Sequence, residues 1–176
     1  MWEDKDKNHY NQLTNKNVGQ ICNDDFYREI VSYASNNKYK TFLEIGTWNG
    51  LGSTKAFYEG FKNRTDDHND YIFYSLECNK DKCNDAISLY KDNDKMHILN
   101  EVIWNKTPND FYEIFPQCKS NELFKHWNEV DICNMQQCNL FLERNDLPSV
   151  FDIVLLDGGE FTTYHEFQIL KDRIHI

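Results

Sequence analysis

The sequence predicts an α/β protein in which helices cover both faces of a parallel sheet. Short apolar runs alternate with helical patterns along most of the chain, as in successive strand and helix units. Two of the apolar runs, residues 41–45 and 151–156, lead into turns that are rich in glycine. Turns of this kind lie at the carboxyl ends of parallel strands, where ligands bind in open α/β sheets.

The expected elements follow in chain order. Asp24 can cap a first helix, and a polar loop separates the second helix from the second strand. We expect helices at residues 25–34, 52–61, 81–90 and from about 161 onward, the last with a threonine cap, Thr162. We expect strands at residues 41–45, 71–76, 96–103 and 151–156.

A long connection, residues 105–149, separates the third strand from the fourth. Thr107 and Pro108 predict the start of a helix, and amphipathic pieces follow at residues 121–129 and 135–143. Because a crossover needs only about a dozen residues, we expect an insert that covers a sheet edge or shapes a substrate pocket.

Size and charge limit the partners. The 176 residues, 40% of them hydrophobic, suit one domain over residues 18–176, preceded by a flexible leader of residues 1–17. The formal net charge of −10 argues against nucleic acid, because phosphate binding needs clustered lysine and arginine. The sequence has no apolar run of roughly 18 residues and no signal-peptide core. We therefore expect a soluble cytoplasmic protein without a membrane partner.

The cysteines are expected to be reduced thiols. They are scattered along a chain that is too large to need disulfides for stability. Their spacing disfavours a redox pair and a zinc site. The six are Cys22, Cys78, Cys83, Cys118, Cys133 and Cys138.

The first glycine-rich turn indicates a cofactor loop. Gly46, Gly50 and Gly52 follow the spacing G-x-x-x-G-x-G, whereas the dinucleotide fingerprint is G-x-G-x-x-G. Glu44, near the end of the strand, would not favour an anionic pyrophosphate, so a cationic or hydrogen-bond-donating ligand fits better. The alternative is that the glycines only form a tight turn.

Glu77 follows the second strand, a position that predicts a contact with a ribose. Its two carboxylate oxygens can accept hydrogen bonds from both ribose hydroxyls. Dinucleotide enzymes and methyltransferases both use such an acid, so Glu77 does not choose between them. The alternative is a solvated carboxylate at the end of a strand.

Residues 44–50 resemble the first motif of class I S-adenosylmethionine (SAM)-dependent methyltransferases. Asp157, Gly158 and Gly159, with the helix after them, resemble the fourth motif of small-molecule O-methyltransferases and related bacterial methyltransferases. The resemblance extends from about residue 17 to the C-terminus. It implies a Rossmann-like sheet of order 3-2-1-4 with the first residues of a fifth strand, incomplete relative to the seven strands of that fold.

The resemblance also implies roles for individual residues. Glu44, Gly46, Thr47 and Gly50 would hold the methionine part of the cofactor. Ser53 would cap its helix or touch the cofactor carboxylate, with capping favoured. Glu77 would bind the ribose, and Glu101 or Trp104 would flank the adenine, although Trp104 equally suits the core. Asp157 would lie at the cofactor and the reaction zone.

The implied reaction moves a methyl group from SAM to an oxygen or nitrogen of a small acceptor. Asp157 or His165 would orient or deprotonate the acceptor; His165 has the better reference pKa and Asp157 the better position. Metal-using members bind a divalent cation at this acid, but their second ligand set comes from the next strand, so the sequence supports no metal.

Two alternatives remain open for the function. One is a catalytically inactive SAM-binding or interaction module that lacks the substrate half of the fold. The other, disfavoured by the glycine spacing, is a nicotinamide-dependent oxidoreductase. We also expect a truncated sheet, since the sequence stops at Ile176 where a fifth strand begins, and a homodimer through its exposed edge.

Overall fold

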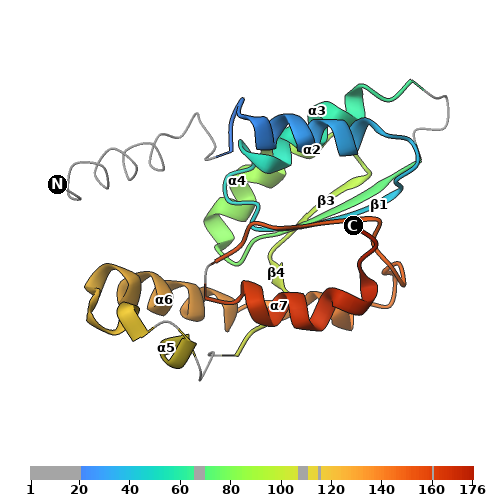
Figure 1. The fold of residues 1–176 in the computed structure, drawn as a ribbon. Coiled ribbons are helices and arrows are strands. Elements are labelled where there is room, and N and C mark those ends of the chain that lie inside the picture. The colour runs from blue at the N-terminus through green and yellow to red at the C-terminus, as the bar shows by residue number, and fades with distance from the viewer. Residues whose placement is uncertain (1–20, 66–69, 107–110, 115, 160) are drawn as a thin grey trace.

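The computed structural model describes residues 21–65, 70–106, 111–114, 116–159 and 161–176. The expected leader of residues 1–17 and the helix start at Thr107 and Pro108 lie outside the described residues. Figure 1 shows a sheet between two layers of helices, as predicted.

The main sheet has four parallel strands. They are β1 (Thr41–Ile45), β2 (Ile72–Leu76), β3 (Met96–Leu99) and β6 (Ile153–Leu156). Their order is β3-β2-β1-β6, which confirms the predicted order 3-2-1-4. The sheet is shorter than the seven strands of a full methyltransferase sheet.

The first residues of a fifth strand are also present. Phe151 and Ile174 form a parallel bridge, the amide of Phe151 donates to the Arg173 carbonyl at 2.8 Å, and the amide of Ile176 donates to the Asp152 carbonyl at 3.0 Å. The chain therefore returns beside β6 after helix α7, as the sequence predicts.

Alternate residues of the strands build two cores, because successive side chains point to opposite faces of a sheet. Phe42 and Phe73 face a layer of three helices, α2 (Asp25–Ser35), α3 (Ser53–Lys62) and α4 (Lys80–Tyr90). Leu43 and Tyr74 face α7 (Thr163–Leu170) and the segment around Phe141. Both faces of the strands are thus buried, which explains their continuous apolar runs.

The third predicted strand is divided in two at Asn100, so residues 96–103 do not form one element. The Asn100 side-chain amide donates to the carbonyls of Glu77 at 2.8 Å and Cys78 at 3.0 Å. After this turn a short strand, β4 (Glu101–Val102), leaves the main sheet and pairs in parallel with β5 (Asn139–Leu140). The long connection therefore adds a second sheet of two strands.

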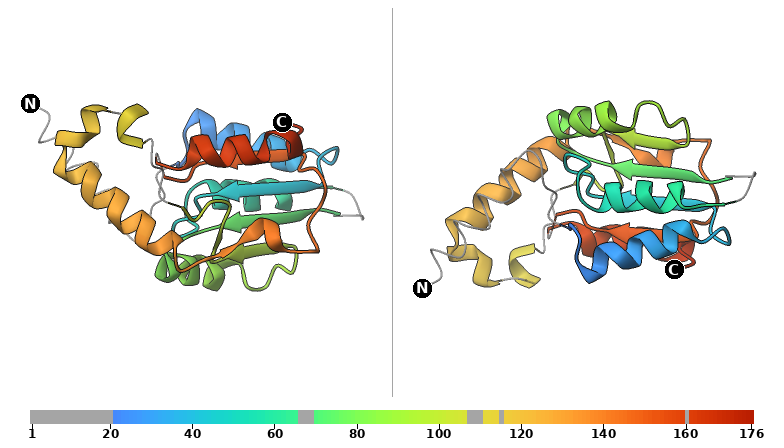
Figure 2. Two further views of the ribbon diagram at one scale, coloured as in Figure 1. Left: turned by 90° about the horizontal axis from the view of Figure 1, so that it is seen from below. Right: turned by 90° about the horizontal axis from the view of Figure 1, so that it is seen from above.

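The connection between β4 and β6 contains one long helix where the sequence predicted two pieces. Helix α6 (Glu122–Met135) begins at its cap Asn121, whose side chain accepts from the Leu123 amide at 3.0 Å. The second amphipathic piece, residues 135–143, does not form a continuous helix, because it supplies β5 and places Phe141 in the core. Figure 2 shows α6 extending away from the main sheet.

Short helices complete the fold. They are α5 (Phe111–Ile114) and the 3-10 helices η1 (Pro116–Ser120), η2 (Phe141–Glu143) and η3 (Lys171–Arg173). Asp24 caps α2 as predicted and accepts from the Tyr27 amide at 2.7 Å. A threonine, Thr162, stands at the cap position of α7, as predicted, but its side chain makes no capping bond. The Thr163 hydroxyl donates to the Gly159 carbonyl at 2.9 Å.

The cysteine prediction is confirmed where it can be examined. Cys22, Cys78, Cys83, Cys133 and Cys138 are free thiols, and the Cys118 side chain lies outside the described part of the structure. Among the helices in the described ranges, none combines the length and the apolarity that a membrane span requires.

Candidate cofactor and acceptor site

The carboxyl ends of β1, β2 and β6 converge at Gly46. Its amide donates to the Leu76 carbonyl at 2.9 Å, and its φ of 103° is one that side chains rarely allow. A Cβ at Gly46 would lie 2.1 Å from the Asp157 carbonyl oxygen. Only glycine therefore lets the first loop pack against the turn after β6, which brings the two predicted motifs into direct contact.

Glu44 is completely buried beneath this loop. Its Oε2 accepts from the Thr54 hydroxyl at 2.7 Å and from the Ser75 hydroxyl, while its Oε1 has no hydrogen-bond partner. Burial raises the pKa of Glu44 to about 7, nearby hydroxyls partly offset this, and the Asp157 carboxylate adds to it. The carboxyl group therefore lacks one donor, which a ligand in the loop can supply.

The hydroxyl of Thr47 points into the protein. Thr47 Oγ1 is hydrogen-bonded to Ser75 Oγ, and Ser75 in turn donates to Glu44. The glycine pattern gave no indication of Ser75 or Thr54; the pairing of Glu44 with Ser75 in the sheet register and the helical position of Thr54 place them there. These hydroxyls hold the Glu44 carboxyl group in one orientation.

Glu77 is 7% exposed, so the alternative of a solvated carboxylate is wrong. Its Oε2 accepts from the Trp48 amide at 2.7 Å, and its Oε1 accepts from the Asn79 amide at 2.8 Å. Burial raises the pKa of Glu77, and these amide donors oppose the shift. Each carboxylate oxygen keeps a further lone pair for a ligand hydroxyl.

Gly50 lies where the loop meets α4. Its φ is 77°, and a Cβ would lie 3.0 Å from the Ala86 Cβ and 3.0 Å from the Tyr90 ring. The Tyr90 hydroxyl donates to the Gly50 carbonyl oxygen. The loop is therefore fixed at Gly46 by the sheet and at Gly50 by a helix.

Asp157 stands at the end of β6 and accepts from the Ser53 hydroxyl at 3.3 Å. The predicted capping role of Ser53 is wrong: Gly52 occupies the cap position, and Ser53 is the first residue of α3. Asp157 is exposed to solvent, yet the protein around it partly desolvates its carboxyl group and raises its pKa to about 6. Such an acid is suited to exchange a proton near neutral pH.

Glu166 is a further acid that the sequence placed in the first turn of α7 but to which it gave no role. It is 4% exposed, and its Oε2 has no hydrogen-bond partner. This oxygen lies 3.7 Å from the position that a Cβ on Gly158 would take. Burial raises the pKa of Glu166 to about 7, partly offset by Thr162. Its place near the first turn of the last predicted helix was the only signal in the sequence.

His165 stacks on Trp104, with ring centroids 4.7 Å apart and ring planes at 14°. Trp104 also packs against the cluster around Val102 and Met135, which agrees with the core alternative for this residue. Glu101 forms an ion pair with Arg144 at 3.1 Å. The expected adenine contact of Glu101 and the expected base role of His165 stay predictions.

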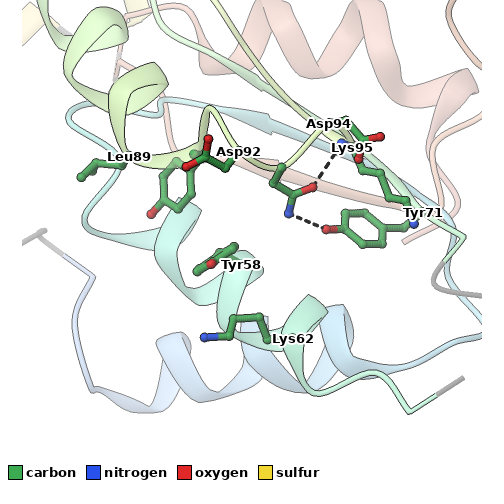
Figure 3. A pocket seen from close by; sticks show the side chains of 9 residues that line it. Tyr58, Lys62, Tyr71, Leu89, Asp92, Asp94 and Lys95 are labelled. Carbon is green, nitrogen blue, oxygen red and sulfur yellow. Dashed lines mark hydrogen bonds between the residues drawn. The ribbon is translucent and has the colours of Figure 1, made fainter. Parts of the chain in front are cut away.

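A cavity of about 400 Å³ lies at the amino ends of β2 and β3, on the opposite edge of the sheet. Figure 3 shows Tyr71 and Lys95 at its wall. The Asn93 side-chain amide donates to the Tyr71 hydroxyl at 2.8 Å, and its oxygen accepts from the Lys95 amide at 3.1 Å. The residues of the two motifs are absent from its lining, so it is separate from the candidate site.

A similar fold occurs in a solved methyltransferase. The O-methyltransferase from Bacillus cereus in complex with S-adenosylhomocysteine (SAH) superposes with a TM-score of 0.51 and 14% identity, over 98% of this chain and 60% of that one. The chain has the fold of the class I SAM-dependent methyltransferases. The SAH-bound methyltransferase PaMTH1 of Podospora anserina gives a TM-score of 0.49 and 16% identity, over 84% of this chain and 46% of that one.

These methyltransferase likenesses are structural only. No family model matches the chain, and no curated protein matches it in sequence. The chain spans about half the length of the two methyltransferases. Within the described ranges, no group of three potential metal ligands comes together.

Proposed function

We propose that the protein binds SAM and transfers its methyl group to a nitrogen or oxygen of a small acceptor. The observation that carries this proposal is the buried Oε1 of Glu44, which has no hydrogen-bond partner beneath the loop that begins at Gly46. A buried carboxylate oxygen without a donor is costly, and the ammonium of SAM offers the missing donor. The methyltransferase fold supports the same cofactor.

The chain's residues would divide the binding between them. Glu44 would bind the methionine ammonium directly or through water, and Gly46 and Gly50 would let the loop approach the cofactor. Glu77 would accept from the ribose hydroxyls with its remaining lone pairs. The carboxyl ends of β1 and β2 bring these two acids to one edge of the sheet, where ligands bind in this class of fold.

SAM supplies an electrophilic methyl group on a sulfonium when it is bound. The protein's part is to hold the acceptor in line with that group, since methyl transfer depends on placement more than on covalent help. Asp157 is the residue best placed to take a proton from the acceptor, because it lies next to Gly46 and its pKa is raised to about 6. The net charge of −10 supports a small molecule, not nucleic acid, as that acceptor.

Calorimetry with SAM, SAH and NAD tests the proposal. We expect SAM and SAH to bind and NAD not to bind. We expect Glu44→Gln to weaken the binding of SAM more than the binding of SAH, because SAM carries an additional positive charge on its sulfonium. Glu29→Gln, on the exposed side of α2, serves as the matched control. A preference for NAD would end the methyltransferase proposal. Binding of SAM without SAH production from any acceptor would favour the inactive binding module.

A further inference from the structure

The cavity at the amino ends of β2 and β3 has the size of a small-molecule site. Its volume of about 400 Å³ lies in the range of ligand pockets in proteins. Three tyrosines, Tyr58, Tyr71 and Tyr90, are part of its lining. They come from α3, from the chain just before β2 and from the end of α4. Three aromatic rings from three segments therefore meet at one cavity (Figure 3).

The tyrosine rings are held in place by contacts within the protein. The Tyr71 hydroxyl accepts from the Asn93 side-chain amide at 2.8 Å, and the Tyr71 ring stacks on Phe61 with centroids 3.9 Å apart. The Tyr90 hydroxyl donates to a backbone carbonyl of the first loop, and its ring lies 5.3 Å from the Tyr58 ring. Because the walls are already ordered, a ligand that packs on them loses little free energy in arranging them.

Positive charge lies against two of these rings. Lys62 Nζ is 5.4 Å from the centroid of the Tyr58 ring, and Lys95 Nζ is 5.3 Å from that of the Tyr71 ring. Both lysines line the cavity. A cationic ligand would meet like charge at ring faces that the two ammonium groups already occupy. The cavity therefore favours an anion over a cation.

Lys62 is the lysine that can receive the anion. Among the ion pairs between described residues, none involves Lys62. Two acids, Asp92 and Asp94, also line the cavity, but both are exposed to solvent, which screens their charges. Figure 3 shows both aspartates apart from Lys62, which comes from α3. An anionic group beside Lys62 therefore lies away from them.

We propose that this cavity binds a small aromatic carboxylate, with its ring against Tyr58 and Tyr71 and its carboxylate group at Lys62. An aromatic ring packs favourably against tyrosine rings, and the carboxylate accepts from the lysine ammonium group. The cavity lies at the opposite edge of the sheet from the two motifs. This binding site is therefore independent of the proposed methyl transfer.

Three probes on the complete 176-residue chain test the inference. They are benzoate, benzamide and cyclohexanecarboxylate. Benzamide keeps the aromatic ring and lacks the charge at pH 7, whereas cyclohexanecarboxylate keeps the charge and lacks the aromatic ring. Calorimetry measures the dissociation constant of each. We expect benzoate to bind about threefold or more tightly than either of the others, as for an exposed ion pair and an aromatic pair.

Four variants locate the binding. Lys62→Gln should remove the preference for benzoate over benzamide, and Tyr58→Leu should remove the preference for benzoate over cyclohexanecarboxylate. Asp92→Asn takes a negative charge from the lining, so it should raise the affinity for benzoate. Lys119→Gln removes an exposed lysine of η1, outside the lining of the cavity, and should change nothing. Lys62 is itself exposed, so its substitution should leave the thermal midpoint unchanged.

Several results would overturn the inference. Equal affinity for benzoate and benzamide, no binding of any of the three probes, or a charge preference that survives Lys62→Gln would each do so. A fall in benzoate affinity that is as large in Lys119→Gln as in Lys62→Gln would show a general attraction of anions to lysines, and would also overturn it.

Discussion

The backbone amide of Trp48 donates a hydrogen bond of 2.7 Å to Glu77 Oε2. Trp48 has a φ of 50°, a conformation that is uncommon for a bulky residue and costs about 1–3 kcal/mol. Its ring is also held from α4, where Lys82 Nζ lies 4.8 Å from the ring centroid. Glu77 therefore shapes the first loop, in addition to its expected contact with a ribose.

Glu77→Ala should weaken SAM binding by about 1–3 kcal/mol, because the ribose donors lose a charged acceptor and the Trp48 amide loses its partner. Calorimetry on the variant and on Glu29→Ala, a matched change on the exposed side of α2, measures this. An unchanged dissociation constant for SAM in Glu77→Ala would show that Glu77 does not contact the cofactor.

Gly46→Ala should lower the free energy of unfolding by about 2–4 kcal/mol, since the new Cβ would overlap the Asp157 carbonyl and the backbone φ is positive. Urea denaturation provides the measurement. Gly158→Ala is the control, because its Cβ would meet the Ile45 side chain at 3.2 Å and no backbone atom closer than 3.7 Å. Equal stability of the two variants would contradict the tight packing at Gly46.

The stability of the unliganded protein should fall as the pH rises toward 7. The pKa values of Glu44 and Glu166 are raised from 4.5 to about 7 in the folded protein. The folded state therefore holds protons more tightly, and this stabilisation is complete below about 4.5 and lost as the pH rises through about 7. Thermal melts from pH 4.5 to 8 measure it, and Glu44→Gln should flatten the slope.

The change in thermal midpoint caused by SAM should follow the opposite trend over the same pH range. SAM is cationic and favours the ionised form of Glu44, so its stabilising effect should grow between about pH 6 and 8. A SAM effect that is constant with pH, or that declines, would place the ammonium away from Glu44.

All six cysteines should react with a thiol reagent after denaturation without any reductant. The five described thiols are free, and burial raises the pKa of Cys83 to about 11, so this thiol should react slowly in the folded protein. Mass spectrometry counts the labels in both states. A stoichiometric disulfide would contradict the expectation.

Local patterns in the sequence were sufficient to predict the main sheet. Each strand is a short apolar run, so the strands and the α/β class could be predicted. The order β3-β2-β1-β6 was implied by the resemblance to methyltransferases. The break at Asn100 could not be predicted, because it depends on side-chain bonds to Glu77 and Cys78, 23 and 22 residues away. The pairing of β4 with β5 is equally non-local.

The residues of the candidate site also fall into those that could be predicted from the sequence and those that could not. Glu44, Gly46 and Asp157 carry motifs that could be recognised in the sequence. Glu166 and the hydroxyl of Ser75 could not be recognised, because their contacts come from the packing of a helix and a neighbouring strand against the motifs. The homodimer through the sheet edge and the cytoplasmic location stay predictions, and light scattering would measure the first.

Tyr90 contacts both the cofactor loop and the cavity at the far edge of the sheet. Its hydroxyl holds the Gly50 carbonyl of the cofactor loop, while its ring lines the cavity at the far edge of the sheet and lies 5.3 Å from the Tyr58 ring. A molecule that shifts this ring must also disturb the loop, and thermodynamic linkage makes the effect mutual. If a ligand in the cavity and a ligand in the loop both require this ring to move, each would change the affinity of the other by the same factor.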